Sequence, residues 1–270
     1  MDLGLNDRRA LVTGSTAGIG FAAAEELLSE GAKVIITSRT AQRAEDARKR
    51  LIDSTNKPAD HIEIAAGDLS TEEGAQALVD QLQNTGFPDI LVNNVGFFEV
   101  KPIDELTDAD WYSMFNINVM SGVRMTKALF PHMIEKGWGR IVFVASEQSL
   151  KPNPEMMHYA MTKTAQVSIA RSFAELGRGK GVTSNSVLVA PTWSEGVEVF
   201  LERMAHDAGK TVPEMRSAFF TEGDGVSSLI ERFADTKEIA AQIAFLCSER
   251  ASAVTGAAQR VDGGIVRSLF

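Results

Sequence analysis

Tyr159 and Lys163 lie four positions apart in the segment HYAMTK, a spacing that could support acid–base chemistry. Residues four apart share one face of an α-helix, so both side chains would point the same way. A phenol with an ordinary pKa of about 10 is a poor proton donor at neutral pH. A neighbouring ammonium favours the phenolate and lowers that pKa. On this pair alone, packing explains Tyr159 as well as catalysis does.

A second hydroxyl, that of Ser146, ends the strand-like segment GRIVFVASE, thirteen residues before Tyr159. Parallel α/β sheets bind ligands beyond the carboxyl ends of their strands. A strand-end hydroxyl beside a helix-borne phenol provides two hydrogen-bond donors for a single carbonyl oxygen. Ser146 therefore favours the catalytic interpretation of Tyr159.

A glycine-rich segment, TGSTAGIG, lies between the first predicted strand and the first predicted helix. Gly14, Gly18 and Gly20 would allow a tight turn and let a pyrophosphate approach backbone N–H groups at a helix N-terminus. Glycines at such a turn can also be purely conformational. Their position at the first strand-to-helix crossover favours phosphate binding.

The end of the second predicted strand, TSRT, indicates which dinucleotide would bind. A carboxylate usually holds the ribose 2′-hydroxyl of NAD there, but this chain has Ser38 followed by Arg39. A guanidinium can bind a 2′-phosphate, although an arginine at a strand end is often only a solvated charge. NADP is therefore predicted ahead of NAD.

The elements that must position these residues alternate between short β-rich segments and amphipathic helical segments. Such alternation predicts parallel strands, right-handed crossovers and helices on both faces. We therefore expect an α/β fold, a doubly wound, Rossmann-like parallel sheet, in a single NAD(P)-binding domain over 1–270. The segment 193–235 is too long for an ordinary connection and is predicted to form a substrate-covering lid before the last helix and strand. A helical stretch over about 108–135 should break or bend near Pro131.

Composition narrows the range of partners. The formal charge of −9 and pI near 5.1 argue against nucleic acid and anionic membranes, because phosphate-binding surfaces need a basic excess. Cys247 is the only cysteine, so neither an intramolecular disulfide nor a cysteine-based metal cluster is available. The charged N-terminus and the lack of a run of about 20 apolar residues predict neither a signal peptide nor a membrane span. A cytoplasmic protein with a small-molecule substrate and no metal is expected.

Several segments in order, TGSTAGIG, GDLS, NNVG, NINVMSG, YAMTK and RVDGG, together with Ser146, resemble a single-domain short-chain dehydrogenase/reductase over nearly the whole chain. The resemblance implies that Ser146 binds the substrate oxygen and that Tyr159 delivers or removes its proton. It implies that Lys163 lowers the pKa of Tyr159 and holds the nicotinamide ribose, and that Asn118 holds a helix backbone open to a water on the proton path. The cofactor would supply the hydride chemistry.

The same resemblance implies a set of cofactor contacts. Asp68 would bind the adenine amino group, and Ser194 would stand where a threonine contacts the nicotinamide amide. Asp68 could instead cap the following helix, a role for which Ser70 is better placed, and Asn94 could be a turn former. The implied cofactor-binding residues are Gly14, Ser15, Thr16, Gly18, Ile19, Gly20, Arg39, Asp68, Leu69, Asn94, Gly96, Tyr159, Lys163, Thr192 and Ser194.

The chain departs from the family pattern around the expected nicotinamide site. Val95 in NNVG adds bulk beside the nicotinamide ribose, and Val189 and Ala190 replace a usual Pro-Gly pair. That replacement alters the backbone path, because proline fixes φ and glycine permits conformations that alanine avoids. His158 should face away from the site. The aromatic residues that suggest an apolar pocket, with core packing as the alternative for the last two, are Phe97, Phe98, Trp193, Phe219 and Phe220.

The sequence leaves three functions open. The preferred one is an NADP(H)-dependent oxidoreductase that interconverts a secondary alcohol and a ketone, on a hydrophobic substrate. The alternatives are a 3-ketoacyl-acyl-carrier-protein-type reductase and a non-catalytic cofactor-binding regulator. The complete set of Asn118, Ser146, Tyr159 and Lys163 opposes the regulator, whereas the altered turn at Val189 supports it. The family also implies a homo-oligomer, a tetramer or a dimer.

Overall fold

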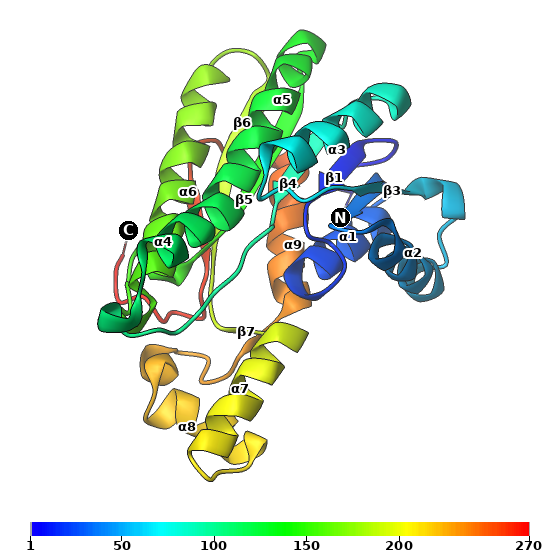
Figure 1. Cartoon of the computed structure of the whole chain (residues 1–270). Helices are drawn as coiled ribbons and strands as arrows, with labels where there is room; N and C mark the ends of the chain where they lie inside the picture. The colour runs from blue at the N-terminus through cyan, green and yellow to red at the C-terminus, as the bar shows by residue number, and fades with distance from the viewer. Residues whose placement is uncertain (1, 270) are drawn as a thin grey trace.

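The computed structural model of the chain describes residues 2–269, whose long strands form one seven-stranded parallel sheet (Figure 1). The strand order is β3-β2-β1-β4-β5-β6-β9, which reverses between β1 and β4 as in a doubly wound sheet. The predicted α/β fold class is confirmed. The strands are β1 (Arg9–Val12), β2 (Lys33–Ser38), β3 (Ile62–Ala66), β4 (Ile90–Asn93), β5 (Gly139–Ser146), β6 (Val182–Val189) and β9 (Ala258–Val261).

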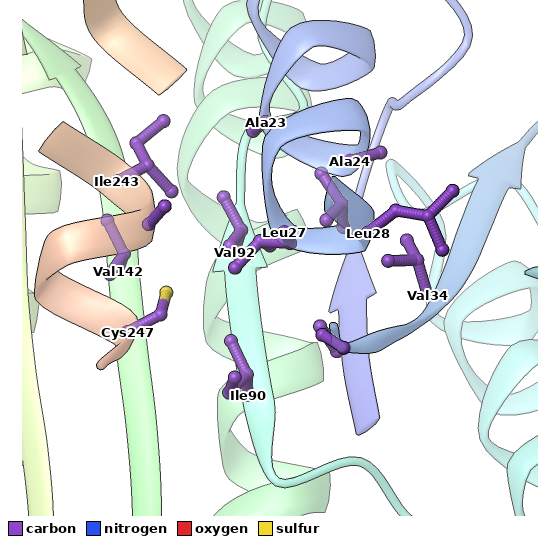
Figure 2. Close-up of a cluster of buried hydrophobic side chains, with 14 of the residues drawn as sticks. Ala23, Ala24, Leu27, Leu28, Val34, Ile90, Val92, Val142, Ile243 and Cys247 are labelled. Atoms are coloured by element: carbon purple, nitrogen blue, oxygen red, sulfur yellow. The ribbon is translucent and has the colours of Figure 1, made fainter. Parts of the chain in front are cut away.

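Helices cover both faces of the sheet, because the strands carry apolar side chains on both faces. Along β1, Ala10 and Val12 pack into one apolar core and Leu11 into the other, so apolar side chains occupy both faces. Figure 2 shows the first core, where Leu27 lies beside Val92 and Ile243 lies near Val142. The first core is covered by α1 (Gly18–Ser29), α2 (Ala41–Thr55) and α9 (Thr236–Cys247), and the second by α3 (Glu72–Thr85), α5 (Ser121–Lys136) and α6 (Met157–Leu176).

The helical stretch after β4 is interrupted at a different place from the one expected. α4 (Asp108–Phe115) passes into a π-helical turn, η3 (Asn116–Met120), and then into α5. The sequence predicted a break or a bend near Pro131; Pro131 lies inside α5, which continues to Lys136, so the break is wrong. The missing N–H of one proline is tolerated because the core-facing side chains of α5 hold the helix on the sheet. π-turns are frequent at functional sites.

Residues 192–235 form a separate helical hairpin, here called the insert. Its two ends are joined by a parallel pair, β7 (Thr192–Trp193) with β8 (Ala234–Asp235), and between them lie α7 (Glu195–Asp207) and α8 (Val212–Thr221). Figure 1 shows α7 and α8, in yellow, beyond one end of the sheet. The insert has its own apolar core, formed by Leu201, Ala205, Met215, Phe220 and Phe233. Phe220 is therefore a packing residue.

Short 3₁₀ turns lie between these elements. They are η1 (Ala59–His61), η2 (Ile103–Glu105), η4 (Glu147–Ser149), η5 (Pro154–Met156), η6 (Asp224–Ser227) and η7 (Glu249–Ala251).

Across residues 2–269, none of the helices combines the length and apolar character needed to cross a membrane.

Candidate active site

A cavity of about 950 Å³ opens at the carboxyl ends of β1, β4, β5 and β6 and extends beneath the insert. It brings together residues from segments far apart in the sequence, as the open edge of a doubly wound sheet does. The catalytic candidates Ser146, Tyr159 and Lys163 line it. So do most of the expected cofactor residues: Gly14, Thr16, Gly18, Ile19, Arg39, Asp68, Leu69, Asn94, Gly96, Thr192 and Ser194.

Ser15 and Gly20, two of the expected cofactor residues, do not line the cavity. Ser15 is fully buried; its hydroxyl donates to the Val12 carbonyl (2.7 Å) and accepts from the Thr37 amide (2.8 Å). A Cβ atom at Gly20 would lie 2.4 Å from the Asn94 amide nitrogen and 2.5 Å from the Gly14 carbonyl oxygen. Ser15 and Gly20 therefore support the conformation of the glycine loop and do not form the cavity wall.

Asn94 also holds the glycine loop in place. Its side-chain amide donates to the carbonyl oxygens of Thr13 (3.0 Å) and Gly14 (3.1 Å). The loop turns through positive φ at Gly14 (63°) and Gly18 (55°), a conformation that only glycine adopts without strain. The spacing of the glycines is thus a conformational requirement, and it leaves the first amides of α1 facing the cavity.

The N-terminus of α1 already holds an anionic group. The Gly18 amide donates to a carboxylate oxygen of Glu195, in the first turn of α7, at 3.0 Å. The N-cap residue Ala17 supplies no side-chain cap, and helix N-termini attract anions through their free amides and dipole. The carboxylate stands in for an anionic phosphate oxygen, so the loop fits a dinucleotide pyrophosphate.

Glu195 should therefore compete with the pyrophosphate of a dinucleotide. We expect Glu195→Gln to bind NADPH about threefold to tenfold more tightly, because the variant lacks the charge that occupies the α1 N-terminus. Isothermal titration of NADPH measures this, with Glu198→Gln, in the same turn of α7, as the matched control. Unchanged or weaker binding by Glu195→Gln alone would contradict the competition.

Two arginines lie at the far end of the cavity, after β2. Arg39 lines it as predicted, and Arg43, from the first turn of α2, lines it as well. The hydrogen bond from Ser70 lowers the pKa of Asp68, and the nearby Arg39 guanidinium acts in the same direction. Arg43 was not predicted from the sequence, although its position at the start of the helix that follows Arg39 was the available signal.

Asp68 does not cap α3, and neither does Ser70. The Asp68 carboxylate accepts from the backbone amide of Ser70 (3.0 Å) and from its hydroxyl (2.7 Å). The N-cap is Thr71, whose hydroxyl accepts from the Gly74 amide at 3.1 Å. The expectation that Ser70 is better placed as the cap is wrong by one residue. Asp68 is held as a carboxylate at the cavity wall.

Tyr159 has a different electrostatic environment from the one expected. The Lys163 ammonium donates to the Val144 carbonyl (2.9 Å) and lies 5.5 Å from the centre of the Tyr159 ring. Burial raises the pKa of Tyr159, the Glu147 carboxyl raises it further, and a hydrogen bond with Ser146 opposes them. The expected lowering by Lys163 is wrong for this structure. Tyr159 is held as the neutral phenol, which is the form that donates a proton.

Lys163 is affected by the same burial. Desolvation lowers the pKa of its ammonium to about 8, and the Glu147 carboxyl partly offsets this. A Cβ atom at Gly96 would lie 3.5 Å from the Lys163 nitrogen, so a side chain there would crowd the ammonium. The ammonium stays charged near neutral pH and can hold a ligand oxygen.

Asn118 is fully buried in the π-turn and does not line the cavity. Its side-chain oxygen accepts from the Phe97 amide (2.8 Å), and its amide donates to the Phe97 carbonyl (2.9 Å) and to Thr162 (3.0 Å). The main-chain carbonyl that was expected to face a water already accepts from Gln166 at 2.7 Å. Asn118 therefore ties the loop after β4 to α6, and so positions the cavity wall.

The part of the cavity near Tyr159 is largely apolar. Phe98 packs edge-on against Tyr159 (ring centres 6.4 Å apart) and against Phe200 of α7 (5.6 Å). For Phe219 the sequence left pocket lining and core packing open, and the structure shows both: Phe219 lines the cavity and packs against Phe233 in the insert core. Trp193 packs against Phe233 as well.

His158 faces away from the cavity, as expected. It is buried against Trp111, and its Nε2 lies 3.6 Å from a carboxylate oxygen of Glu99.

The Val189–Ala190 departure extends β6. Val189 pairs in register with Val261 of β9, and the Ala190 amide donates to the Val261 carbonyl at 3.0 Å. Proline at position 189 would have no N–H for the ladder, whereas valine suits a buried strand. Both residues line the cavity, so the end of β6 forms part of its wall.

Glu147, immediately after Ser146, is the residue of most consequence that sequence reasoning missed. It lines the cavity, and burial raises the pKa of its carboxyl. Its position next to a candidate catalytic serine was the available signal. Glu147 and Glu195 gain significance only from contacts that the fold creates.

Comparisons with known proteins agree with this geometry. The family model described as short chain dehydrogenase matches residues 8–205. An uncharacterized oxidoreductase of Bacillus subtilis (strain 168), YvrD, is 45% identical over 269 residues and covers 100% of both chains. The 3-oxoacyl-[acyl-carrier-protein] reductase FabG of Haemophilus influenzae is 31% identical, covering 96% of this chain and 98% of its own. The crystal structure of L-sorbose reductase from Gluconobacter frateurii, complexed with NADPH and L-sorbose, is 30% identical, covers 100% of both chains and superposes with a TM-score of 0.92. This protein therefore belongs to the short-chain dehydrogenase family and is an oxidoreductase, as the glycine loop, the strand order and the similarity over the whole chain together show.

Proposed function

We propose that this oxidoreductase interconverts a secondary alcohol and a ketone, with NADP(H) in preference to NAD(H). The observation that carries the proposal is the convergence of Ser146, Tyr159 and Lys163 on one wall of the cavity that begins at the glycine loop. Two hydroxyl donors and one ammonium at that place suit a carbonyl oxygen that gains negative charge. Similarity to a reductase solved with NADPH supports the choice of cofactor.

The residues present fit a bound NADP(H). The Gly18 amide would hold the pyrophosphate, Arg39 and Arg43 the 2′-phosphate, and Lys163 the nicotinamide ribose. When bound, NADPH supplies the hydride.

In the reducing direction, each residue acts on the substrate oxygen. The carbonyl carbon takes the hydride while the π pair moves onto oxygen, which takes the phenolic proton of Tyr159. Ser146 donates a hydrogen bond to the same oxygen as negative charge develops on it. In the oxidising direction, Tyr159 accepts that proton back. The raised pKa of Tyr159 favours reduction, since the phenol is then the resting form.

The insert would act as the lid, and its chemistry favours a substrate with an apolar part. Phe98 packs against both Tyr159 and Phe200, and Phe219 lines the same cavity. A second candidate, reduction of a 3-oxoacyl thioester, is supported by the 31% identity to FabG of Haemophilus influenzae. The two substrates are distinguished by whether an acyl carrier raises kcat/KM.

The fold family and the apolar side chains exposed on several helices support a homo-oligomer, a tetramer or a dimer. Tyr112 of α4 and Leu176 of α6 are both more than half exposed. The single, buried Cys247 fits a reducing compartment such as the cytoplasm. Size-exclusion chromatography with light scattering measures the oligomeric state.

Screening a panel of ketones tests the proposed function. Aliphatic and aryl ketones, 3-oxoacyl thioesters and keto sugars are each mixed with NADPH or NADH, and cofactor oxidation is followed by absorbance. We expect turnover of at least one apolar ketone, with a higher kcat/KM for NADPH than for NADH. Binding of NADPH without oxidation across the whole panel would favour the non-catalytic regulator.

A further inference from the structure

Glu147 makes a buried hydrogen-bond chain with the candidate catalytic serine. The Ser146 hydroxyl donates to Glu147 Oε2, and the side-chain amide of Gln148 donates to Glu147 Oε1 at 3.0 Å. The Ser146 oxygen in turn accepts from the Gln148 backbone amide at 3.2 Å. In this arrangement the single proton of the Ser146 hydroxyl is directed at a carboxylate and away from any substrate oxygen.

The orientation of Gln148 determines which oxygen of Glu147 can carry a proton. The Gln148 side-chain oxygen accepts from the Asn153 backbone amide at 2.7 Å, so its NH₂ group must face Glu147 Oε1. Oε1 thus remains an acceptor whether Glu147 is charged or neutral. A proton on Glu147 would have to lie on Oε2, which faces the Ser146 oxygen.

Protonation of Glu147 would reverse its hydrogen bond to Ser146. Oε2–H would then donate to the Ser146 oxygen, which also accepts from the Gln148 amide. With both acceptor positions of the hydroxyl used, its proton points into the cavity on the side of Tyr159, with which Ser146 also forms a hydrogen bond.

We propose that Glu147 is a positioning residue for the reaction: as the neutral acid it turns the Ser146 proton toward the substrate oxygen, and as the carboxylate it turns that proton away. The proposal rests on the proposed function, because it assigns the oxyanion donor of that site. Since the Ser146 hydroxyl must leave a charge-assisted hydrogen bond to serve the substrate, the carboxylate state should be slower by roughly tenfold to a hundredfold.

The surroundings of Glu147 allow both charge states. Burial raises the pKa of its carboxyl, and the hydrogen bonds from Ser146 and Gln148 oppose this. Of the elements packed against η4, β6 has no titratable side chain, and α6 brings Tyr159, Lys163 and the buried His158, which faces away from the cavity. The segment after η4 adds Lys151 and Glu155. A raised pKa means that the neutral acid persists to higher pH than for an exposed glutamate, and that activity falls as pH rises through it.

The pH profile of kcat/KM for ketone reduction tests this, with NADPH deuterated at C4 to verify that hydride transfer is being measured. The wild-type profile should fall by roughly tenfold to a hundredfold in a step that is additional to the one caused by Lys163. Glu147→Gln should lack that step and stay at the upper level, because its amide donates permanently to Ser146. Glu99→Gln, which removes a charge beside the buried His158, should keep that step. A step retained in Glu147→Gln would overturn the proposal.

A double-mutant comparison separates action through Ser146 from a direct charge effect on Tyr159 or Lys163. In a Ser146→Ala background, the step should be absent with Glu147 and with Gln at that position. If the step survives Ser146→Ala and disappears only on adding Glu147→Gln, the carboxylate acts directly and the positioning role is overturned.

A measurement independent of turnover follows the carboxyl itself. Infrared difference spectra of wild type against Glu147→Gln, recorded through a pH titration, report the C=O band of the neutral acid. Ser146→Ala should move the midpoint upward, because it removes a donor to the carboxylate; an unmoved midpoint would overturn the coupling. If the wild type reduces no ketone, the proposed function fails, and this titration still decides whether Ser146 and Glu147 are coupled.

Discussion

Replacing Tyr159 with phenylalanine should lower kcat for ketone reduction by about a hundredfold to ten-thousandfold, the usual contribution of a positioned proton donor. The variant keeps the ring, and with it the edge-on contact with Phe98. It loses only the hydroxyl whose pKa burial has raised, and which is therefore protonated across the neutral range. Stopped-flow measurement of NADPH oxidation gives the rate of the chemical step.

The matched control is Tyr112→Phe, since Tyr112 is the only other tyrosine and is exposed on α4. Its kcat should equal that of the wild type. NADPH affinity should change little in Tyr159→Phe, because Lys163 and the glycine loop remain intact. A variant that keeps most of its activity would remove Tyr159 from the proton-transfer step.

Wild-type reduction should also decline above about pH 8, and the sign follows from Lys163. Burial lowers the pKa of its ammonium to about 8, so the charge that would hold the nicotinamide ribose is present below that pH and lost above it. Tyr159 does not cause this decline, since its raised pKa keeps the phenol protonated there.

Replacing Arg39 with alanine should weaken NADPH binding by about tenfold to a hundredfold, while NADH binding stays nearly constant. A hydrogen bond to a charged group contributes about 1.5–3 kcal/mol, and NADH has no 2′-phosphate with which to form it. Arg43 lines the same end of the cavity, so the double variant Arg39→Ala/Arg43→Ala should lose more affinity than either single variant. Titration calorimetry with both cofactors measures the preference without any substrate.

Lys49→Ala provides the control, because Lys49 is an exposed cation on the same helix as Arg43. It should leave both affinities unchanged. Equal weakening of NADPH and NADH by Arg39→Ala would mean that Arg39 is only a solvated charge at the end of β2.

Much of the candidate site could be predicted from short-range patterns. Ser146 ends one strand and the glycine loop follows another, and the carboxyl ends of parallel strands meet at one edge of the sheet. Tyr159 and Lys163 share a helix face because of their spacing. Arg43, Glu147 and Glu195 were missed because each has an ordinary local context: Glu195 contacts Gly18 across 177 residues of sequence.

The location of the helix interruption also depended on tertiary contacts. Proline has the stronger local signal for breaking a helix, yet α5 passes through Pro131 unbroken. The wider turn forms at Asn118 instead, where Gln166 of α6 and Phe97 of the loop after β4 supply hydrogen bonds. Long-range partners outweighed the local preference.

Spacing along the chain is sufficient to specify the parallel α/β sheet, the tight glycine turn and the common direction of Tyr159 and Lys163, because each depends on geometry within neighbouring elements. Three features emerge only in the folded molecule. The pKa of Tyr159 is raised, Glu195 occupies the N-terminus of α1, and Glu147 forms a hydrogen bond with Ser146. Desolvation and Coulomb fields depend on every group packed around a site, wherever it lies in the sequence.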